Sequence, residues 1–164
     1  MDIPRKKGDR REALELAQTA KARFETTEAA VERYGLDLDR VKDLGDAMLD
    51  QIHQGPQQEN VLWVLETALA MITAVMAVNK EPLPVAPQLD PASYAMSVLR
   101  DLAVDAEARG LSWESLEATA AAVLRRADAT GHANPETYWA LNRATAQLEL
   151  AWARDLAGPE ESAL

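Results

Sequence analysis

The sequence predicts an all-α protein, a six-helix bundle, and three observations lead to this class. Apolar residues recur at helical spacing in six stretches, each bounded by a capping residue, a glycine or a proline. No stretch of the sequence alternates apolar and polar residues between turn signals, as a half-buried strand does. One run, residues 61–78, is apolar almost throughout and too long for a buried strand, which rarely exceeds about 8 residues. We therefore expect a buried central helix, residues 57–80, with the other helices packed around it.

The first half of the chain begins with a basic segment and a long amphipathic stretch. Residues 1–8 carry lysine and arginine and are expected to form a flexible arm. A helix over residues 9–34 would start at Asp9, whose carboxylate can accept hydrogen bonds from free first-turn amides, and would end at Gly35. Its predicted buried stripe consists of Leu14, Leu16, Ala17, Ala20, Phe24, Ala30 and Val31.

Two further helices complete the first half. Asp37 is the predicted N-cap of a helix over residues 38–53, in which apolar residues repeat every three or four positions. The central helix, residues 57–80, follows a Gly–Pro pair that ends the preceding helix. Only Glu66 and two threonines interrupt its apolar run, so other helices, from the second half or from a second chain, must cover it.

A proline-rich linker, residues 81–91, divides the chain, because its four prolines are incompatible with a helix interior. Beyond it, apolar periodicity and helix-ending glycines predict helices over residues 91–109, 112–130 and 134–156. The acidic tail, residues 159–164, is expected to be loose. The predicted N-caps of these three helices are Asp90, Ser112 and Asn134.

The two sides of the linker resemble each other in sequence. The pattern E-x-x-G-L at Glu32 recurs 75 positions later, and Trp63 recurs 76 positions later as Trp139. Glycine and tryptophan are rare, so their nearly constant spacing favours an internal duplication over chance similarity among alanine-rich helices. We therefore expect a single helical domain, residues 9–158, built from two similar three-helix units. These units are residues 9–80 and residues 91–158.

The composition argues against several classes of function. The formal net charge of −10 repels phosphate backbones, so nucleic-acid binding is not expected. The absence of cysteine excludes disulfides and thiolate chemistry and is compatible with a cytoplasmic location. The central apolar run barely reaches the length of a membrane span, contains a glutamate and lacks flanking basic or aromatic clusters. We therefore do not expect the chain to enter a membrane.

Metal binding and catalysis have weak support in the sequence. Asp43, Asp46 and Asp50 share one face of the second predicted helix and His53 ends it, in a single D-x-x-H pattern. Carboxylate metal sites in helical bundles use such patterns on facing helices, so a solvated acidic face is the simpler interpretation. The sequence also nominates no nucleophile with a neighbouring base. We expect no catalytic residue, no resident metal and no cofactor.

Glu66 is the most unusual candidate for a binding site. A carboxylate in an apolar helix must reach solvent, find a partner or bind a proton. Arg143 follows Asn142, the repeat equivalent of Glu66, which suggests an ion pair between the two halves. Trp63 and Trp139 could line an apolar pocket beside Glu66, although core packing is the usual role of helical tryptophan. The candidates for ligand or partner binding are Trp63, Glu66, Trp139 and Arg143.

These observations predict a non-enzymatic, cytoplasmic helical protein that binds a protein partner, for which a second copy of the chain is one candidate. Two alternatives remain open. One is a small helical sensor or carrier with an apolar ligand pocket near Glu66. The other is a divalent-metal-dependent hydrolase that uses the carboxylates of the second predicted helix.

Overall fold

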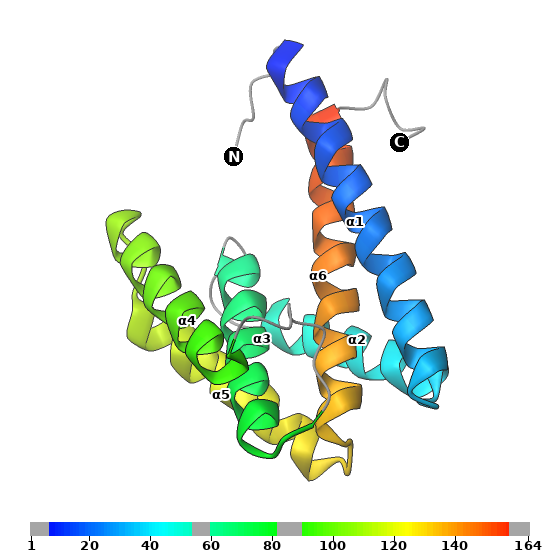
Figure 1. The fold of residues 1–164 in the computed structure, drawn as a ribbon. Helices are drawn as coiled ribbons and strands as arrows, with labels where there is room; N and C mark the ends of the chain where they lie inside the picture. The colour runs from blue at the N-terminus through cyan, green and yellow to red at the C-terminus, as the bar shows by residue number, and fades with distance from the viewer. Residues whose placement is uncertain (1–6, 54–59, 82–89, 158–164) are drawn as a thin grey trace.

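The computed structural model describes residues 7–53, 60–81 and 90–157, and these residues form helices and no strand. Figure 1 shows their arrangement. The six helices of the described residues are α1 (Lys7–Arg33), α2 (Leu38–His53), α3 (Val61–Val78), α4 (Pro91–Ala108), α5 (Trp113–Ala129) and α6 (Asn134–Ala157). The predicted all-α class is therefore confirmed, and every predicted helix is present within a few residues of its expected bounds.

The start of α1 differs from the prediction. The helix begins at Lys7, so Asp9 lies inside its first turn and is not its N-cap. Residues 7 and 8 of the predicted arm are therefore helical, and residues 1–6 lie outside the described residues. The central helix α3 begins at Val61, whereas the prediction started it at residue 57. Most of the predicted linker, residues 82–89, and the predicted tail, residues 159–164, also lie outside the described residues.

The N-termini of the helices follow local capping chemistry. Three predicted N-caps accept hydrogen bonds from backbone amides near the start of their helices. The donor and acceptor pairs are Asp39 N–H with Asp37 Oδ1 (3.0 Å), Ser93 N–H with Asp90 Oδ2 (3.2 Å) and Ser115 N–H with Ser112 Oγ (3.2 Å).

The cap of α6 is different from the expected one. Asn134 lies within the helix, and the N–H of Ala133 donates to Glu136 Oε1 at 3.0 Å. Glu136 thus satisfies the residue that precedes the helix, which is the glutamate half of a capping box. The Asn134 side chain instead donates to Glu81 Oε2 at 3.1 Å, which ties the start of α6 to the chain just after α3.

The C-termini of α1, α4 and α5 end at glycines, as predicted. Gly35, Gly110 and Gly131 have φ angles of +67°, +77° and +81°. In each case the next residue donates its N–H to the carbonyl oxygen five residues earlier, the Schellman arrangement. The end of α3 has the same hydrogen bond, from Glu81 to Met76, but the left-handed position is taken by Lys80 with φ +58°. A side chain at this φ is strained, since Cβ approaches the following carbonyl.

The helices pack mainly with partners from the other half of the chain. In Figure 1, α6 runs antiparallel to α1 and crosses α2, while α3 lies against α4 and α5. Helices α3 and α6 also pack on each other, and α2 touches α5. Within each half, consecutive helices make few contacts. Exchanging α1 with α4, α2 with α5 and α3 with α6 leaves this set of packed pairs unchanged.

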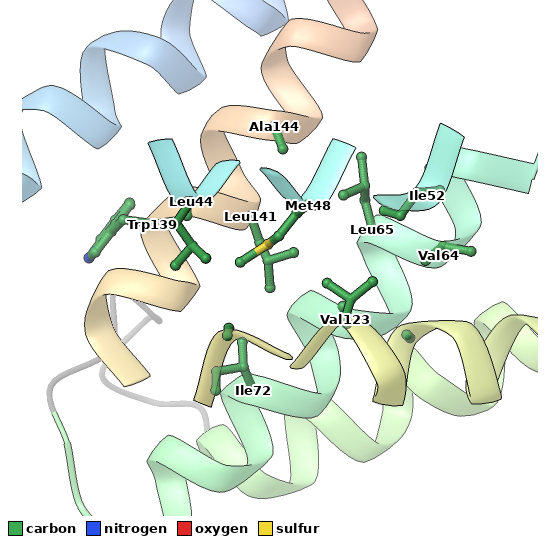
Figure 2. Close-up of a cluster of buried hydrophobic side chains, with 14 of the residues drawn as sticks. Leu44, Met48, Ile52, Val64, Leu65, Ile72, Val123, Trp139, Leu141 and Ala144 are labelled. Carbon is green, nitrogen blue, oxygen red and sulfur yellow. The ribbon is translucent and has the colours of Figure 1, made fainter. Parts of the chain in front are cut away.

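The main core lies between α2, α3, α5 and α6 (Figure 2). Leu65 of α3 and Leu141 of α6 are fully buried there, and Met48 of α2 and Val123 of α5 pack beside them. Close packing of α2 against α6 requires a glycine, because a Cβ on Gly45 would lie 3.1 Å from a backbone carbonyl oxygen of α6. The core therefore joins the two halves of the chain rather than filling either half separately.

Helix α1 uses small residues to approach α6. Ala13, Ala20 and Thr27 are fully buried at seven-residue intervals, whereas Leu14, placed in the buried stripe by the sequence, is 51% exposed. Small side chains allow two helix backbones to come close together, which large side chains would prevent. The predicted stripe was therefore wrong at Leu14.

Helices α3 and α6 are enclosed to the same extent. Nine of the 18 residues of α3 and twelve of the 24 residues of α6 are buried. The polar residues Asn142 and Glu149 of α6 are buried because α1 covers them with Arg23. Helix α3 is long and apolar enough to cross a membrane, but half of it is buried within the fold, as in the core helix of a soluble protein.

Candidate functional site

A polar cavity of about 250 Å³ lies where α1, α3, α4 and α6 meet. Helix α3 contributes residues at positions i, i+3, i+4 and i+7, which form one continuous stripe on a helix. The other three helices close the cavity with polar, aromatic and aliphatic side chains. The lining residues are Arg23, Glu66, Leu69, Ala70, Thr73, Tyr94, Ala95, Val98, Tyr138 and Asn142.

Arg23 is held in place by two residues of α6. Its Nε donates to Glu149 Oε1 at 3.2 Å, and its Nη1 donates to Asn142 Oδ1 at 3.1 Å. The Asn142 amide nitrogen in turn donates to the backbone carbonyl of Tyr138 at 3.0 Å. Since each hydrogen bond fixes the next side chain, the guanidinium has a defined position at the cavity wall.

Glu66 is the second ionisable group of the lining, and it is less well satisfied. Burial raises its pKa, the nearby positive charge of Arg23 lowers it, and the negative charge of Glu149 raises it. Within the described part of the chain, the Glu66 carboxylate makes no hydrogen bond or ion pair. The cavity therefore contains a carboxylate whose charged form lacks a direct partner.

Two other groups around the cavity also respond to burial. Desolvation raises the pKa of the Glu149 carboxyl, while Arg23 lowers it through its charge and its hydrogen bond. Desolvation likewise raises the pKa of the Tyr138 phenol, and the Asn142 side chain opposes this shift. The phenol of Tyr138 therefore stays neutral and able to donate a hydrogen bond at physiological pH.

Of the four residues nominated from the sequence, Glu66 is the one that lines this cavity. Trp139 is 4% exposed and belongs to the core, where its ring meets Tyr138 edge-to-face at 4.9 Å between centroids. Trp63 is partly exposed and lies under the guanidinium of Arg109, at 5.4 Å from the ring centroid. The two tryptophans thus do not form a pocket with Glu66.

Arg143 does not provide the positive charge near Glu66. Its guanidinium lies over the ring of Phe24, 5.4 Å from the centroid, on the side of α6 that faces α1. Its Nε atom is buried and has no hydrogen-bond partner among the described residues. The guanidinium that acts on Glu66 electrostatically belongs to Arg23, which lies in the same half of the chain, so the expected ion pair between the two halves is not formed.

The acidic residues of α2 remain on the surface. Asp43, Asp46 and Asp50 are exposed, and Asp46 Oδ1 accepts a hydrogen bond from the Gln147 side chain at 3.3 Å. The side chain of His53 lies outside the described residues. In the part of the chain that the structure describes, no group of three histidine, cysteine, aspartate or glutamate residues is arranged to hold a metal ion.

A second hollow, of about 240 Å³, lies between α2 and α5. Its floor is apolar, and ionisable side chains occur among its lining residues. One of these, His132, shares a hydrogen bond of 2.8 Å between its Nδ1 and Thr130 Oγ1. The lining residues are Asp43, Leu44, Ala47, Met48, Gln51, Val123, Arg126, Ala127, Thr130 and His132.

Sequence reasoning missed most of the polar cavity, although the repeat contained a signal. Glu66 and Asn142 are 76 positions apart, and Arg23 and Val98 are 75 positions apart, so two pairs of equivalent positions line one cavity. A cavity where the two halves meet would combine equivalent positions in this way. The sequence does not indicate that Arg23 is the arginine at the cavity, because it is one of many charged residues in the long helix α1.

Comparisons with protein-family models, curated proteins and solved structures found no match for this chain. The geometry is therefore the basis for a function. The cavity offers hydrogen-bond donors and acceptors, a fixed guanidinium, a half-buried carboxylate and an aliphatic wall. Its lining, as described, includes no histidine, cysteine or serine, and the hydroxyl of Thr73 already donates to the backbone carbonyl of Leu69 at 2.7 Å. This arrangement is suited to binding.

Proposed function

We propose that the chain is a non-enzymatic, cytoplasmic binding protein, a small sensor or carrier, that holds a small polar molecule in the cavity between α1, α3, α4 and α6. One observation supports this proposal: three different helices present polar side chains to the same cavity. These side chains are Arg23, Glu66 and Asn142. A few positioned polar groups in a largely preformed cavity are typical of ligand sites. The ligand expected is polar, which differs from the apolar ligand that the sequence suggested.

The rigidity of the site supports binding rather than a passive packing defect. A void in a protein core is normally apolar and dry, and buried polar groups are normally paired. Here Arg23 is anchored by Glu149 and Asn142, while Glu66 beside it has no direct partner among the described residues. A bound molecule that hydrogen-bonds to Glu66 would remove the free-energy cost of leaving this desolvated carboxylate without a partner.

Native mass spectrometry of gently purified, untagged protein tests the proposal. We expect extra mass that is lost on denaturation, and a rise in melting temperature with the recovered small molecule, because ligand binding stabilises the native state. The Val98→Trp variant fills the cavity and should lose both effects. Val104→Trp, on the exposed side of the same helix, is the matched control and should keep them. Equal behaviour of both variants would contradict the proposal.

A protein partner is the second candidate function, and a specific surface favours it. Val75 and Val78 of α3 and Met96 of α4 are exposed, and Val78 is 76% exposed. These side chains lie on two helices that pack against each other, and exposed apolar surface is typical of interaction sites. Sedimentation velocity over a wide concentration range tests for self-association, and Val78→Asp should abolish it. A monomer at every concentration would exclude a second copy as the partner.

We also propose that the two halves arose by duplication of a three-helix unit that paired with itself. The support is the set of packed helix pairs, which is unchanged when the halves are exchanged, and the matching turns at Gly35 and Gly110. Residues 87–164 alone should then dimerise at high concentration, each α6 packing on α4 and α5 of the other copy. An unfolded monomer at every concentration would argue against this origin.

A further inference from the structure

The charges around the polar cavity do not balance. Arg23 and Glu66 line the cavity, and Glu149, which is not part of the lining, is bonded to Arg23, so these three groups carry one positive and two negative charges when ionised. Arg23 forms a salt bridge with Glu149 at 3.2 Å, and solvent screens this pair weakly because the two side chains are only 25% and 11% exposed. One negative charge, on Glu66, therefore remains without a direct counter-ion among the described residues.

A half-buried carboxylate without a direct counter-ion favours a positively charged ligand. Desolvation makes the ionised form of such a group unfavourable, and a bound cation restores it through a charge-assisted hydrogen bond. An anionic ligand would share Arg23 with Glu149, which already pairs with its charge, and would also lie close to the carboxylate of Glu66. The arrangement thus selects against carboxylates and phosphates and in favour of a monocation.

The remaining walls of the cavity indicate the kind of cation. The phenol rings of Tyr94 and Tyr138 lie on its α4 and α6 sides, and aromatic rings attract cations within about 6 Å of the ring centroid. Leu69 and Val98 supply an aliphatic surface for a hydrocarbon portion. The volume of about 250 Å³ is equivalent to about eight water molecules at about 30 Å³ each. This space is suited to a molecule with about eight to ten non-hydrogen atoms.

We propose that the cavity binds a small primary amine in its protonated form, with Glu66 as the counter-ion and the tyrosine and aliphatic walls around its hydrocarbon part. This inference rests on the proposed binding function and specifies its ligand class. Glu66 would contact the ammonium group directly, whereas Arg23 would act by holding Glu149 and Asn142 in place.

Three probes of nearly equal size test this assignment, namely phenethylamine, 2-phenylethanol and phenylacetate. They share a benzene ring and differ in the charge of the polar group. NMR titration of the ¹⁵N-labelled full chain gives both the dissociation constants and the location of the perturbed amides. We expect phenethylamine to bind at least ten-fold more tightly than 2-phenylethanol, with shifts on α3, α4 and α6 around the cavity, and phenylacetate to bind most weakly.

Two glutamate variants connect this preference to the cavity. Glu66→Gln keeps the size of the side chain and removes its charge, so the preference for the amine over the alcohol should disappear. Glu25→Gln, on the exposed surface of α1, is the control and should leave the preference intact. The three-probe comparison on the unmodified chain remains decisive even if the Glu66→Gln variant did not fold.

The possible outcomes separate the ligand class from the binding function. If 2-phenylethanol bound as tightly as phenethylamine, or phenylacetate bound most tightly, the amine assignment would be overturned while the cavity would stand as a binding site. If no probe perturbed amides around the cavity, the amine assignment would also fail. The binding function itself would then depend on the native mass spectrometry of the unmodified chain and of Val98→Trp.

Discussion

Replacing Trp139 and Trp63 separately with alanine compares two tryptophans, 76 positions apart in the sequence, that have different environments. Trp139 is 4% exposed and packs in the core that joins the two halves, whereas Trp63 is partly exposed under Arg109. A tryptophan side chain buries about 150–250 Å². At about 25 cal/mol per Å², removing the buried ring of Trp139 costs about 4–6 kcal/mol before relaxation. Measured losses for such truncations are about 3–5 kcal/mol, which we adopt for Trp139→Ala.

The expected loss for Trp63→Ala is smaller, about 2–3 kcal/mol, because part of the ring already contacts water. The expected loss for Trp63→Ala includes about 0.5–1 kcal/mol for the lost contact with the Arg109 guanidinium. Sequence analysis alone, which treated both residues as core, would assign about 3–5 kcal/mol to Trp63 as well. Trp152, which is 36% exposed at the far end of α6, provides a control in which Trp→Ala should cost less than about 1 kcal/mol.

Urea denaturation followed by far-UV circular dichroism measures these free energies. With a slope of about 2 kcal/mol per M, the midpoint should fall by about 2 M for Trp139→Ala and by about 1 M for Trp63→Ala. Circular dichroism is preferred to fluorescence, since each variant removes an emitting residue. A loss for Trp63→Ala equal to or larger than that for Trp139→Ala would show that the environments of these two side chains have been misassigned.

Three further predictions concern the backbone, the topology and the cavity. Lys80→Gly should stabilise the protein by about 0.5–1 kcal/mol in urea denaturation, because it relieves the strain of a side chain on a left-handed backbone. This gain is what remains after the extra entropy that glycine gives the unfolded chain. A lower midpoint would contradict the strain at Lys80. Fragments 1–86 and 87–164 should each be poorly helical alone at low micromolar concentration, because most helix packing joins the two halves. When they are mixed, circular dichroism should show that helicity returns. Independent folding of both fragments would refute the intertwined topology. Because the pKa of Glu66 is raised, its contribution to stability is present below the unfolded pKa and is lost as pH rises through the folded pKa. In thermal melts, Glu66→Gln should therefore be more stable than the parent chain near pH 7 and approach it near pH 4. A constant difference across this range would show that Glu66 is not desolvated.

The local elements were largely predictable because their signals are local. Asp37, Asp90 and Ser112 cap their helices through side-chain contacts with residues two or three positions away, so the sequence contains both partners. The glycines that end α1, α4 and α5 adopt a backbone conformation that few other residues tolerate, which makes them reliable markers. The end of α3 at Lys80 had no such marker, since a lysine at positive φ is not expected from its type.

The buried faces were harder to predict where packing depends on close approach. Hydrophobicity placed Leu14 in the buried stripe of α1, yet the face of α1 that meets α6 is made of Ala13, Ala20 and Thr27. Small residues carry little hydrophobic signal individually, and their burial is decided by the distance between two helices. The burial of the polar residues Asn142 and Glu149 of α6 also depends on which helices meet, because α1 covers them with Arg23.

The sequence by itself determined that the chain forms six helices, where most of them begin and end, and that two halves with similar spacing flank a proline-rich segment. It also indicated that Glu66 would need an unusual environment, since a carboxylate in an apolar helix is costly to bury. Only the tertiary structure decided that α3 packs on α4 and α5 while α6 packs on α1 and α2. That choice places Arg23 beside Glu66 and creates the cavity, because contacts between residues more than a hundred positions apart depend on which helices meet and not on the signals within any one of them.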